Sequence, residues 1–320
     1  MRGIDFFVKR TAFAVLTVIF AVTINFLLFR ALPGDAITNL SKVPGATPAL
    51  RAELTTEFGL DRSKWTQYRI YLQQLATGNL GVSFSTQEPV TSILGLALRN
   101  TIPMVLLGTL FSIIFGTITG VLAAWKRRTA LDYGSVGVAL TFYSLPTHWL
   151  GLMLLLITAG YLPRGGREND FLFNPSFFQH WWDVGQHILL PSLTLGLVLY
   201  GQYTLVTRSA MLETLGEDFI LTARAKGLPD RTIVRRHAFR NAMLPVITLV
   251  ALSMGYIVAG SILIETVFSW PGVGLLVSKS VQERDWPVLQ GAFLVITISV
   301  VFFNYVADLL YYEFDPRITT

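Results

Sequence analysis

The 320-residue sequence contains no cysteine, and only 14% of its residues are charged. The absence of cysteine excludes disulfide bonds, thiolate metal ligands and cysteine nucleophiles. With 52% hydrophobic residues and a mean hydropathy of +0.53, the chain is too apolar for an ordinary soluble domain. It is therefore predicted to be a membrane protein. Because its apolar stretches are continuous and not alternating, we expect helices, not barrel strands, to cross the bilayer.

Several motifs of enzymes and energy coupling are missing as well. The phosphate-binding pattern G-x-x-x-x-G-K-[ST], the metal-binding pair H-E-x-x-H and the nucleophile elbow G-x-S-x-G do not occur. We therefore expect no catalytic, cofactor-binding or metal-binding residues in this chain. The apolar stretches also hold almost no acids or bases, which ion-coupled carriers usually need near the middle of the membrane. Any driving energy is expected to come from outside the chain.

Six apolar stretches are long enough to span a membrane, which predicts an all-α polytopic membrane protein with six transmembrane helices. The first stretch follows basic residues, as in a signal peptide, but it is longer than such a region, so a retained helix is expected. The net charge of +5 is concentrated beside the spans, which favours a role in topology over nucleic-acid binding. The predicted spans cover residues 11–30, 101–125, 134–160, 188–207, 243–266 and 289–312.

The basic residues predict the orientation of these spans. The short connection 126–128 is entirely basic, and seven basic residues lie between Arg208 and Arg240. These connections are on the same side as the basic N-terminus, so that side, with both termini, is predicted to be cytoplasmic.

Two segments are predicted to be outside the membrane on the outer face. Segment 31–100 contains an amphipathic stretch around Trp65, Tyr68, Tyr71, Leu72 and Leu75, which predicts a helix capping the outer mouth in preference to a separate ligand domain. Loop 161–187 is rich in phenylalanine and tryptophan, which suit the membrane interface.

The segment from Asp218 to Pro229 is polar and basic although it lies between two apolar stretches. Asp218 and Gly227 are typical start and stop residues of a short helix, and an isolated helix of this length is marginal in water. No other cytoplasmic part of the chain is large enough by sequence to support it, so we expect it to dock on a partner. The predicted contact residues are Asp218, Phe219, Leu221, Thr222, Ala223, Arg224, Ala225, Lys226, Gly227 and Leu228.

Small residues and one proline characterise two of the spans. Gly108, Ser112, Gly116 and Gly120 recur at four-residue steps, which predicts close packing against another helix; a face lining a pathway is the alternative. Pro146 removes a backbone hydrogen bond and predicts a kink in the third span, either beside a pathway or packed against neighbours.

His148, close to this proline, is either a satisfied polar residue or a pathway residue.

Separated motifs over nearly the whole chain resemble one known family. In chain order they are Leu32-Pro-Gly-Asp35, Gly59-Leu-Asp61 with Gln67-Tyr68, Gly78-Asn-Leu-Gly-Val-Ser83, Ala223-Arg-Ala-Lys-Gly227, Arg236-His-Ala238, Arg240-Asn-Ala242, Leu244-Pro245, Glu265-Thr-Val-Phe268, Trp270-Pro-Gly272, Arg284-Asp285 and Asp315-Pro-Arg317. With these motifs the sequence resembles the permease subunits of ABC importers, specifically the B-type subunit of the dipeptide, oligopeptide and nickel family.

The resemblance implies a single transmembrane permease domain over 1–320, with an outer segment 31–100 and a cytoplasmic coupling loop 208–243. In such permeases a short helix of this loop seats in a groove of the ATPase, and Ala223 and Gly227 match its small-residue and glycine positions. Leu221 stands where other branches carry a glutamate.

The resemblance also implies partners: a second permease, distinct or identical, two ATPase subunits or one heterodimer that bind ATP and Mg, and an extracytoplasmic binding protein. The expected location is the cytoplasmic membrane of a bacterium or archaeon. Two other functions remain open: a membrane scaffold that docks an ATPase without transport, and a secondary carrier. The substrate also remains open among peptides, nickel complexes, glutathione and sugars.

Overall fold

The computed structural model describes residues 3–31, 55, 61–169, 171–172 and 174–314, with side chains except those of 3–4, 30–31, 251–252, 254–260 and 310–314. In these ranges the chain is helical and forms no strand, apart from two isolated β-bridges. The helices are α1 (Gly3–Ala31), α4 (Lys64–Ala76), α5 (Val90–Trp125), α6 (Ala130–Ser144), α7 (Thr147–Ile157), α8 (Phe177–Leu215), α9 (Asp218–Ala225), α10 (Asp230–Thr232), the π-helical η1 (Ile233–Ala238), α11 (Phe239–Gly260), α12 (Ile262–Val267), α13 (Val273–Glu283) and α14 (Trp286–Phe314).

Four helices of the described residues are long and apolar enough to cross a membrane, and α6 with α7 makes a fifth span if the bent pair is counted as one. These five correspond to predicted spans one to four and six. The fifth predicted span, 243–266, is divided, because α11 ends at Gly260 and α12 begins at Ile262. A second difference is that α5 begins at Val90, so its first turns lie in the segment 31–100 that was expected to be outside the membrane.

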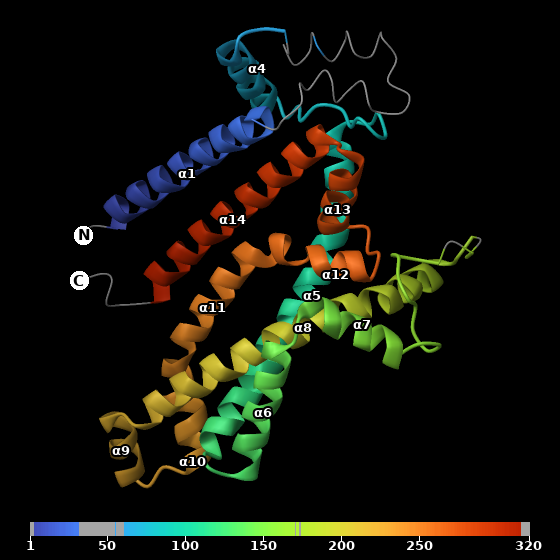
Figure 1. Cartoon of the computed structure of the whole chain (residues 1–320). Coiled ribbons are helices and arrows are strands. Elements are labelled where there is room, and N and C mark those ends of the chain that lie inside the picture. Colours follow the sequence, from blue (N-terminus) through green and yellow to red (C-terminus); the bar gives the residue numbers. More distant parts are fainter. Residues whose placement is uncertain (1–2, 32–54, 56–60, 170, 173, 315–320) are drawn as a thin grey trace.

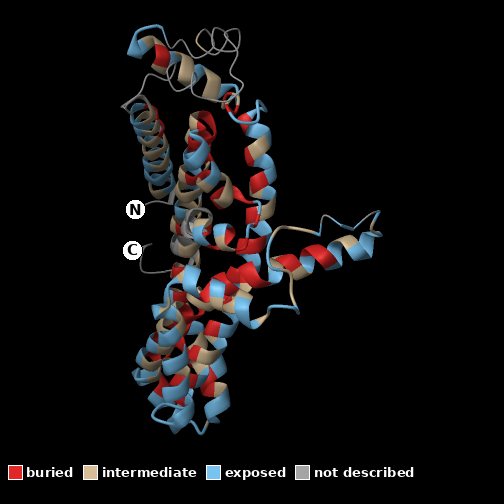
Figure 2. Cartoon of the chain, turned by 45° about the vertical axis from the view of Figure 1, so that its right-hand side comes forward, coloured by how far each residue is buried: buried red, intermediate tan, exposed pale blue. Residues whose placement is uncertain are grey.

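The long helices α5 and α8 form the centre of the fold, and α6 and α11 pack against α8 (Figure 1). Helix α14 packs between α1 and α11, and α1 is mostly exposed along its described length (Figure 2). An outward-facing apolar helix is stable only where lipid or a partner covers it. The burial pattern therefore agrees with a chain that lies in a membrane.

Helix α4 lies across the ends of α1 and α14, at the opposite end of the molecule from α9 (Figure 1). The hydroxyl groups of Thr23 and Tyr68 are 2.7 Å apart, and Asn25 Nδ2 donates to the backbone oxygen of Gln290 at 3.0 Å. The predicted amphipathic helix is thus present, but Trp65 and Leu72 are exposed and not part of its buried face. Residues 32–54 and 56–60 of the same segment, including the motif Leu32-Pro-Gly-Asp35, lie outside the described residues.

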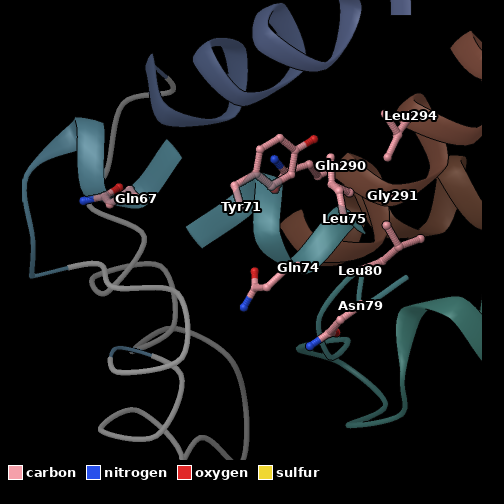
Figure 3. A pocket seen from close by; sticks show the side chains of 9 residues that line it. All are labelled: Gln67, Tyr71, Gln74, Leu75, Asn79, Leu80, Gln290, Gly291 and Leu294. Atoms are coloured by element: carbon pink, nitrogen blue, oxygen red, sulfur yellow. The ribbon is translucent and has the colours of Figure 1, made fainter. Parts of the chain in front are cut away.

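A small cavity of about 20 Å³ lies beside α4 and α14, with room for about one water molecule. Figure 3 shows Tyr71, Gln290, Leu75 and Leu80 around it. This volume is too small for a peptide or a comparable solute.

Candidate functional site

The loop that was predicted to bind a partner contains the short helix α9. Its first residue is Asp218, as predicted, whereas the capping position before it is occupied by Glu217. An acidic residue in the first turn interacts favourably with the positive end of the helix dipole. Asp218 therefore favours the helix start electrostatically, whereas the side chain of Glu217 makes no capping hydrogen bond.

The helix ends in a glycine-dependent cap. Gly227 has a φ of +74°, a left-handed conformation that residues with a Cβ adopt only at a cost. Its N–H donates to Arg224 O at 2.9 Å, and the N–H of Leu228 donates to Ala223 O at 3.3 Å, which is the hydrogen-bond pattern of a Schellman motif. The predicted stop at Gly227 thus has a physical basis in the structure.

The inner face of α9 packs on the chain itself. Ile220 is fully buried and Ala223 is 5% exposed. The expectation that no other cytoplasmic part of the chain is large enough to support the helix is therefore wrong, because the ends of α5 and α8 together with η1 and α11 form that support. Ala223 belongs to this internal contact, so it is not available for close approach by a partner. The cluster comprises Ala124, Ala210, Met211, Ile220, Ala223, Ile233, Val234, Ala238 and Ala242.

Two large apolar side chains of α9 are exposed on the flanks of its buried side, those of Phe219 (41% exposed) and Leu221 (57% exposed). Leu228 is half-buried against the internal cluster. Exposed apolar side chains on a short polar loop are typical of a surface that another protein covers. The remaining exposed residues of the predicted set are Asp218, Thr222, Arg224, Ala225, Lys226 and Gly227.

The stripe of small residues on α5 lies against α8. A Cβ added to Gly108 would lie 2.6 Å from Ser192 O, and one added to Gly120 would lie 2.7 Å from Thr204 O. Ser112 is fully buried. No side chain larger than hydrogen fits at these two glycines without a shift of backbone, so the two helices approach as closely as small-residue packing allows.

Hydroxyl groups connect the same two helices. Ser192 Oγ donates to Met104 O at 2.9 Å, and the hydroxyl oxygens of Thr119 and Thr204 are 3.0 Å apart. Hydrogen bonds between helices strengthen packing inside a membrane, where no water competes for them. The stripe therefore forms part of a firm α5–α8 unit that ends next to α9.

An ion pair that sequence reasoning missed joins α6 to α8 near α9. Arg208 donates to Asp132 from Nε at 2.6 Å and from Nη2 at 3.0 Å, and the Asp132 side chain is 2% exposed. The backbone N–H of Arg128 donates to the same carboxylate at 2.9 Å. The acid at the start of an apolar run was the available signal, but its partner is far away in sequence.

Pro146 ends a helix and does not merely kink it. Helix α6 stops at Ser144, Leu145 is extended, and Pro146 precedes the first residue of α7, so that α6 and α7 enclose a bend of 106°. An extended residue before proline follows from the clash between its backbone and the proline ring. Pro146 and His148 are both exposed.

Two buried carboxylates, which sequence reasoning also missed as structural centres, lie beside the two ends of α13. Glu265 accepts hydrogen bonds from the hydroxyl of Thr101 at 2.8 Å and from the N–H groups of Gly274 and Leu275 at the start of α13. Asp285 accepts hydrogen bonds from Phe84 N at 3.1 Å and from Ser83 and Ser85. These contacts fasten α13 and segment 83–85 to their neighbours.

An open, largely apolar groove of about 710 Å³ lies between α5 and α11. Its walls include Ile114 and Ile118 on α5 and Met243 and Ile247 on α11, and Arg235 of η1 is its one charged lining residue. Part of the membrane-facing surface is therefore uncovered in the single chain.

Two family models match the chain. The model described as the inner membrane component of binding-protein-dependent transport systems matches residues 116–320, and the model of the N-terminal part of such membrane components matches residues 3–105. The helical multi-pass fold agrees with this class, and the chain belongs to this family of inner membrane transport components. The resemblance to ABC importer permeases is thereby confirmed.

Within the family the chain is similar to several named relatives. It is 36% identical over 334 residues to the dipeptide transport system permease protein DppB of Escherichia coli K12, with 98% of each chain covered. It is 36% identical over 329 residues to the di/tripeptide transport system permease protein DppB of Pseudomonas aeruginosa, and 37% identical over 328 residues to the dipeptide permease DppB of Haemophilus influenzae.

Among solved structures, the chain shares its fold with a chain of the inward-facing MetNI methionine ABC transporter. The TM-score is 0.57 at 17% sequence identity, and the match covers 70% of this chain and 96% of the other.

Proposed function

We propose that this chain is a permease subunit of an ATP-driven importer of small peptides and that α9 is its coupling helix. The observation that carries the proposal is the two-sided character of α9: Ile220 and Ala223 fix it to the transmembrane helices, while Phe219 and Leu221 stay exposed. The names of the dipeptide and di/tripeptide relatives support peptides as the substrate class.

The proposed topology has six transmembrane helices, with α11 as the fifth and both termini in the cytoplasm. A sister permease, distinct or identical, forms the pathway together with this chain, and the uncovered groove between α5 and α11 supports a subunit that is one half of an assembly. Two ATPase subunits, or one heterodimer, bind ATP and Mg. An extracytoplasmic binding protein delivers the peptide, and this chain itself catalyses no reaction.

In the proposed cycle, ATPase subunits that close on ATP displace α9. Because α9 shares one apolar cluster with the ends of α5, α8 and α11, these helices move with it. A ligand shifts a conformational equilibrium only by its difference in affinity for the two states. The loaded binding protein must therefore prefer the outward-facing state.

The test uses the complete transporter, reconstituted in vesicles with its ATPases, sister permease and binding protein. In a double variant, Phe219→Ala and Leu221→Ala, the affinity of the permease for the ATPase subunits should fall roughly tenfold or more, as expected for the loss of two apolar contacts in an interface. ATP-dependent uptake of a labelled dipeptide should fall with it. The matched control is Leu263→Ala, which truncates an exposed leucine on α12. Unchanged ATPase binding by the double variant would contradict a coupling role of α9.

The same assay separates the other functions. A scaffold would bind the ATPase but support no uptake, and a secondary carrier would transport without ATP and lose transport when the ion gradient collapses. Ligand screening of the binding protein distinguishes peptides from nickel complexes, glutathione and sugars.

A further inference from the structure

The ion pair between Asp132 and Arg208 has the geometry of a fixed joint. Two nitrogen atoms of the guanidinium group contact the two oxygen atoms of one carboxylate, at 2.6 and 3.0 Å. The backbone N–H of Arg128 adds a third hydrogen bond. A bidentate pair of this kind fixes orientation as well as distance. Because Asp132 is almost completely buried, removal of its partner would leave an uncompensated charge away from water.

This joint lies next to the proposed coupling segment. Arg208 is on the last part of α8, which ends at Leu215 shortly before α9 begins. A Cβ added to Gly120 would lie 3.1 Å from Arg208 N, so α8 is also pressed against α5 at this residue. Asp132 is in the first turn of α6. The pair thus attaches the start of α6 to the part of α8 that would move together with α9.

From α6 the connection continues to α7 and α12 in the middle part of the molecule (Figure 1). Helix α6 leads to the 106° bend at Pro146 and then to α7. A Cβ added to Gly151 of α7 would lie 3.2 Å from side-chain atoms of Val267 and Phe268, next to the Glu265 contacts. Helix α6 is therefore joined to α8 by the ion pair at its start, packs on α8 again near Tyr143 and Gly201, and continues into α7 at its other end.

We propose that Asp132 and Arg208 are positioning residues for coupling, and that their ion pair makes α6 and the bent α7 follow the α9 end of α8. The inference rests on the proposed function of α9 and adds a route to it. In this route neither residue needs to contact the ATPase or the peptide. Without the pair, α9 would still move with α8, but only packing contacts would connect α6 to α8, so α6 would follow less closely and ATP hydrolysis would continue with less transport.

The test compares Asp132→Asn with Asp308→Asn in the reconstituted transporter. Asp308 pairs with Arg10 at 3.0 Å between α14 and α1, away from the proposed route, so it is the matched control. We expect dipeptide uptake per ATP hydrolysed to be about fivefold lower in Asp132→Asn, the size typical of one lost coupling element, and unchanged in Asp308→Asn. Equal uptake per ATP in Asp132→Asn and the unmodified protein would overturn the inference.

A reversible cross-link distinguishes coupling from simple fastening. Because the chain contains no cysteine, Asp132→Cys with Arg208→Cys provides the only reactive thiols of this subunit. A bifunctional thiol reagent with the span of the ion pair should restore uptake per ATP, and a reductant should remove it again in the same assembled protein. Equal coupling before and after reduction would overturn the inference.

If Asp132→Asn does not assemble, Arg208→Lys carries the test, since it keeps the charge but loses the bidentate geometry; unaltered coupling in that variant counts against the joint. Failure of the proposed function has a different signature, because the unmodified transporter would then show no ATP-coupled uptake.

Discussion

Alanine substitution at two glycines should change stability in opposite directions, because only one of them lies in the α5–α8 contact. A Cβ at Gly116 would lie 2.6 Å from Tyr203 Cβ and 3.1 Å from Tyr200 O. Carbon atoms pack at about 3.5–4.0 Å, so the helices would have to separate locally by roughly 1 Å. Backbone oxygen and Cβ atoms do not move with a change of rotamer. The clash therefore has no inexpensive relief.

The expected magnitude for Gly116→Ala is the difference of two effects. Overpacking of a close contact costs about 1–3 kcal/mol, and alanine in a helix gains up to about 1 kcal/mol over glycine. We expect a net loss of about 1–2 kcal/mol, at the upper end if the Thr119–Thr204 contact one turn away opens as well. Gly137 on α6 is exposed and has no atom within 4 Å of an added Cβ, so Gly137→Ala should only gain, by up to about 1 kcal/mol.

The assay is thermal unfolding of the purified protein in detergent, followed by circular dichroism and tryptophan fluorescence; dyes that react with thiols are unsuitable because the chain has no cysteine. The melting temperature should fall for Gly116→Ala and stay level or rise for Gly137→Ala. If Gly116→Ala melts at or above the temperature of Gly137→Ala, the close contact between α5 and α8 at Gly116 is wrong.

Three further results are expected. Gly227→Val should reduce uptake per ATP without loss of membrane insertion, because a φ of +74° costs a residue with a Cβ about 1–2 kcal/mol; Gly227→Asn, which tolerates that conformation, should retain more coupling. Ile220→Ala should destabilise the protein by about 2–5 kcal/mol in thermal unfolding, and a cost near zero would refute its burial. Asp285→Ala should expose segment 83–85 to limited proteolysis. Cleavage at the rate of the unmodified protein would show that the hydrogen bonds of Asp285 do not hold this segment in place.

Local signals allowed part of this molecule to be predicted. The boundaries of α9 follow from an acidic start and a glycine stop, which act within one or two turns. The close packing of α5 against another helix follows from its small residues at steps of four, because residues with this spacing share one helix face. Pro146 predicted a kink in the third span. The complete interruption of the helix requires, in addition, the extended conformation of Leu145 before the proline.

Contacts between distant residues were not predictable in the same way. Arg208 is 76 residues from Asp132, and Ser83 is 202 residues from Asp285. A lone acidic residue at the start of an apolar run has the same sequence signature whether it faces water or a buried partner. The support under α9 was missed for the same reason, since it is assembled from helices that are separate in sequence.

The internal apolar cluster that supports α9 has a consequence for how the proposed complex with an ATPase forms. Since its buried side and its glycine cap are already in place in the single chain, the helix does not have to fold when a second protein arrives. Little ordering entropy is then lost on contact, so a small exposed area can give useful affinity. A preformed helix also passes on the full displacement caused by a bound partner, whereas a segment that became ordered only on binding would lose part of that displacement to its own rearrangement.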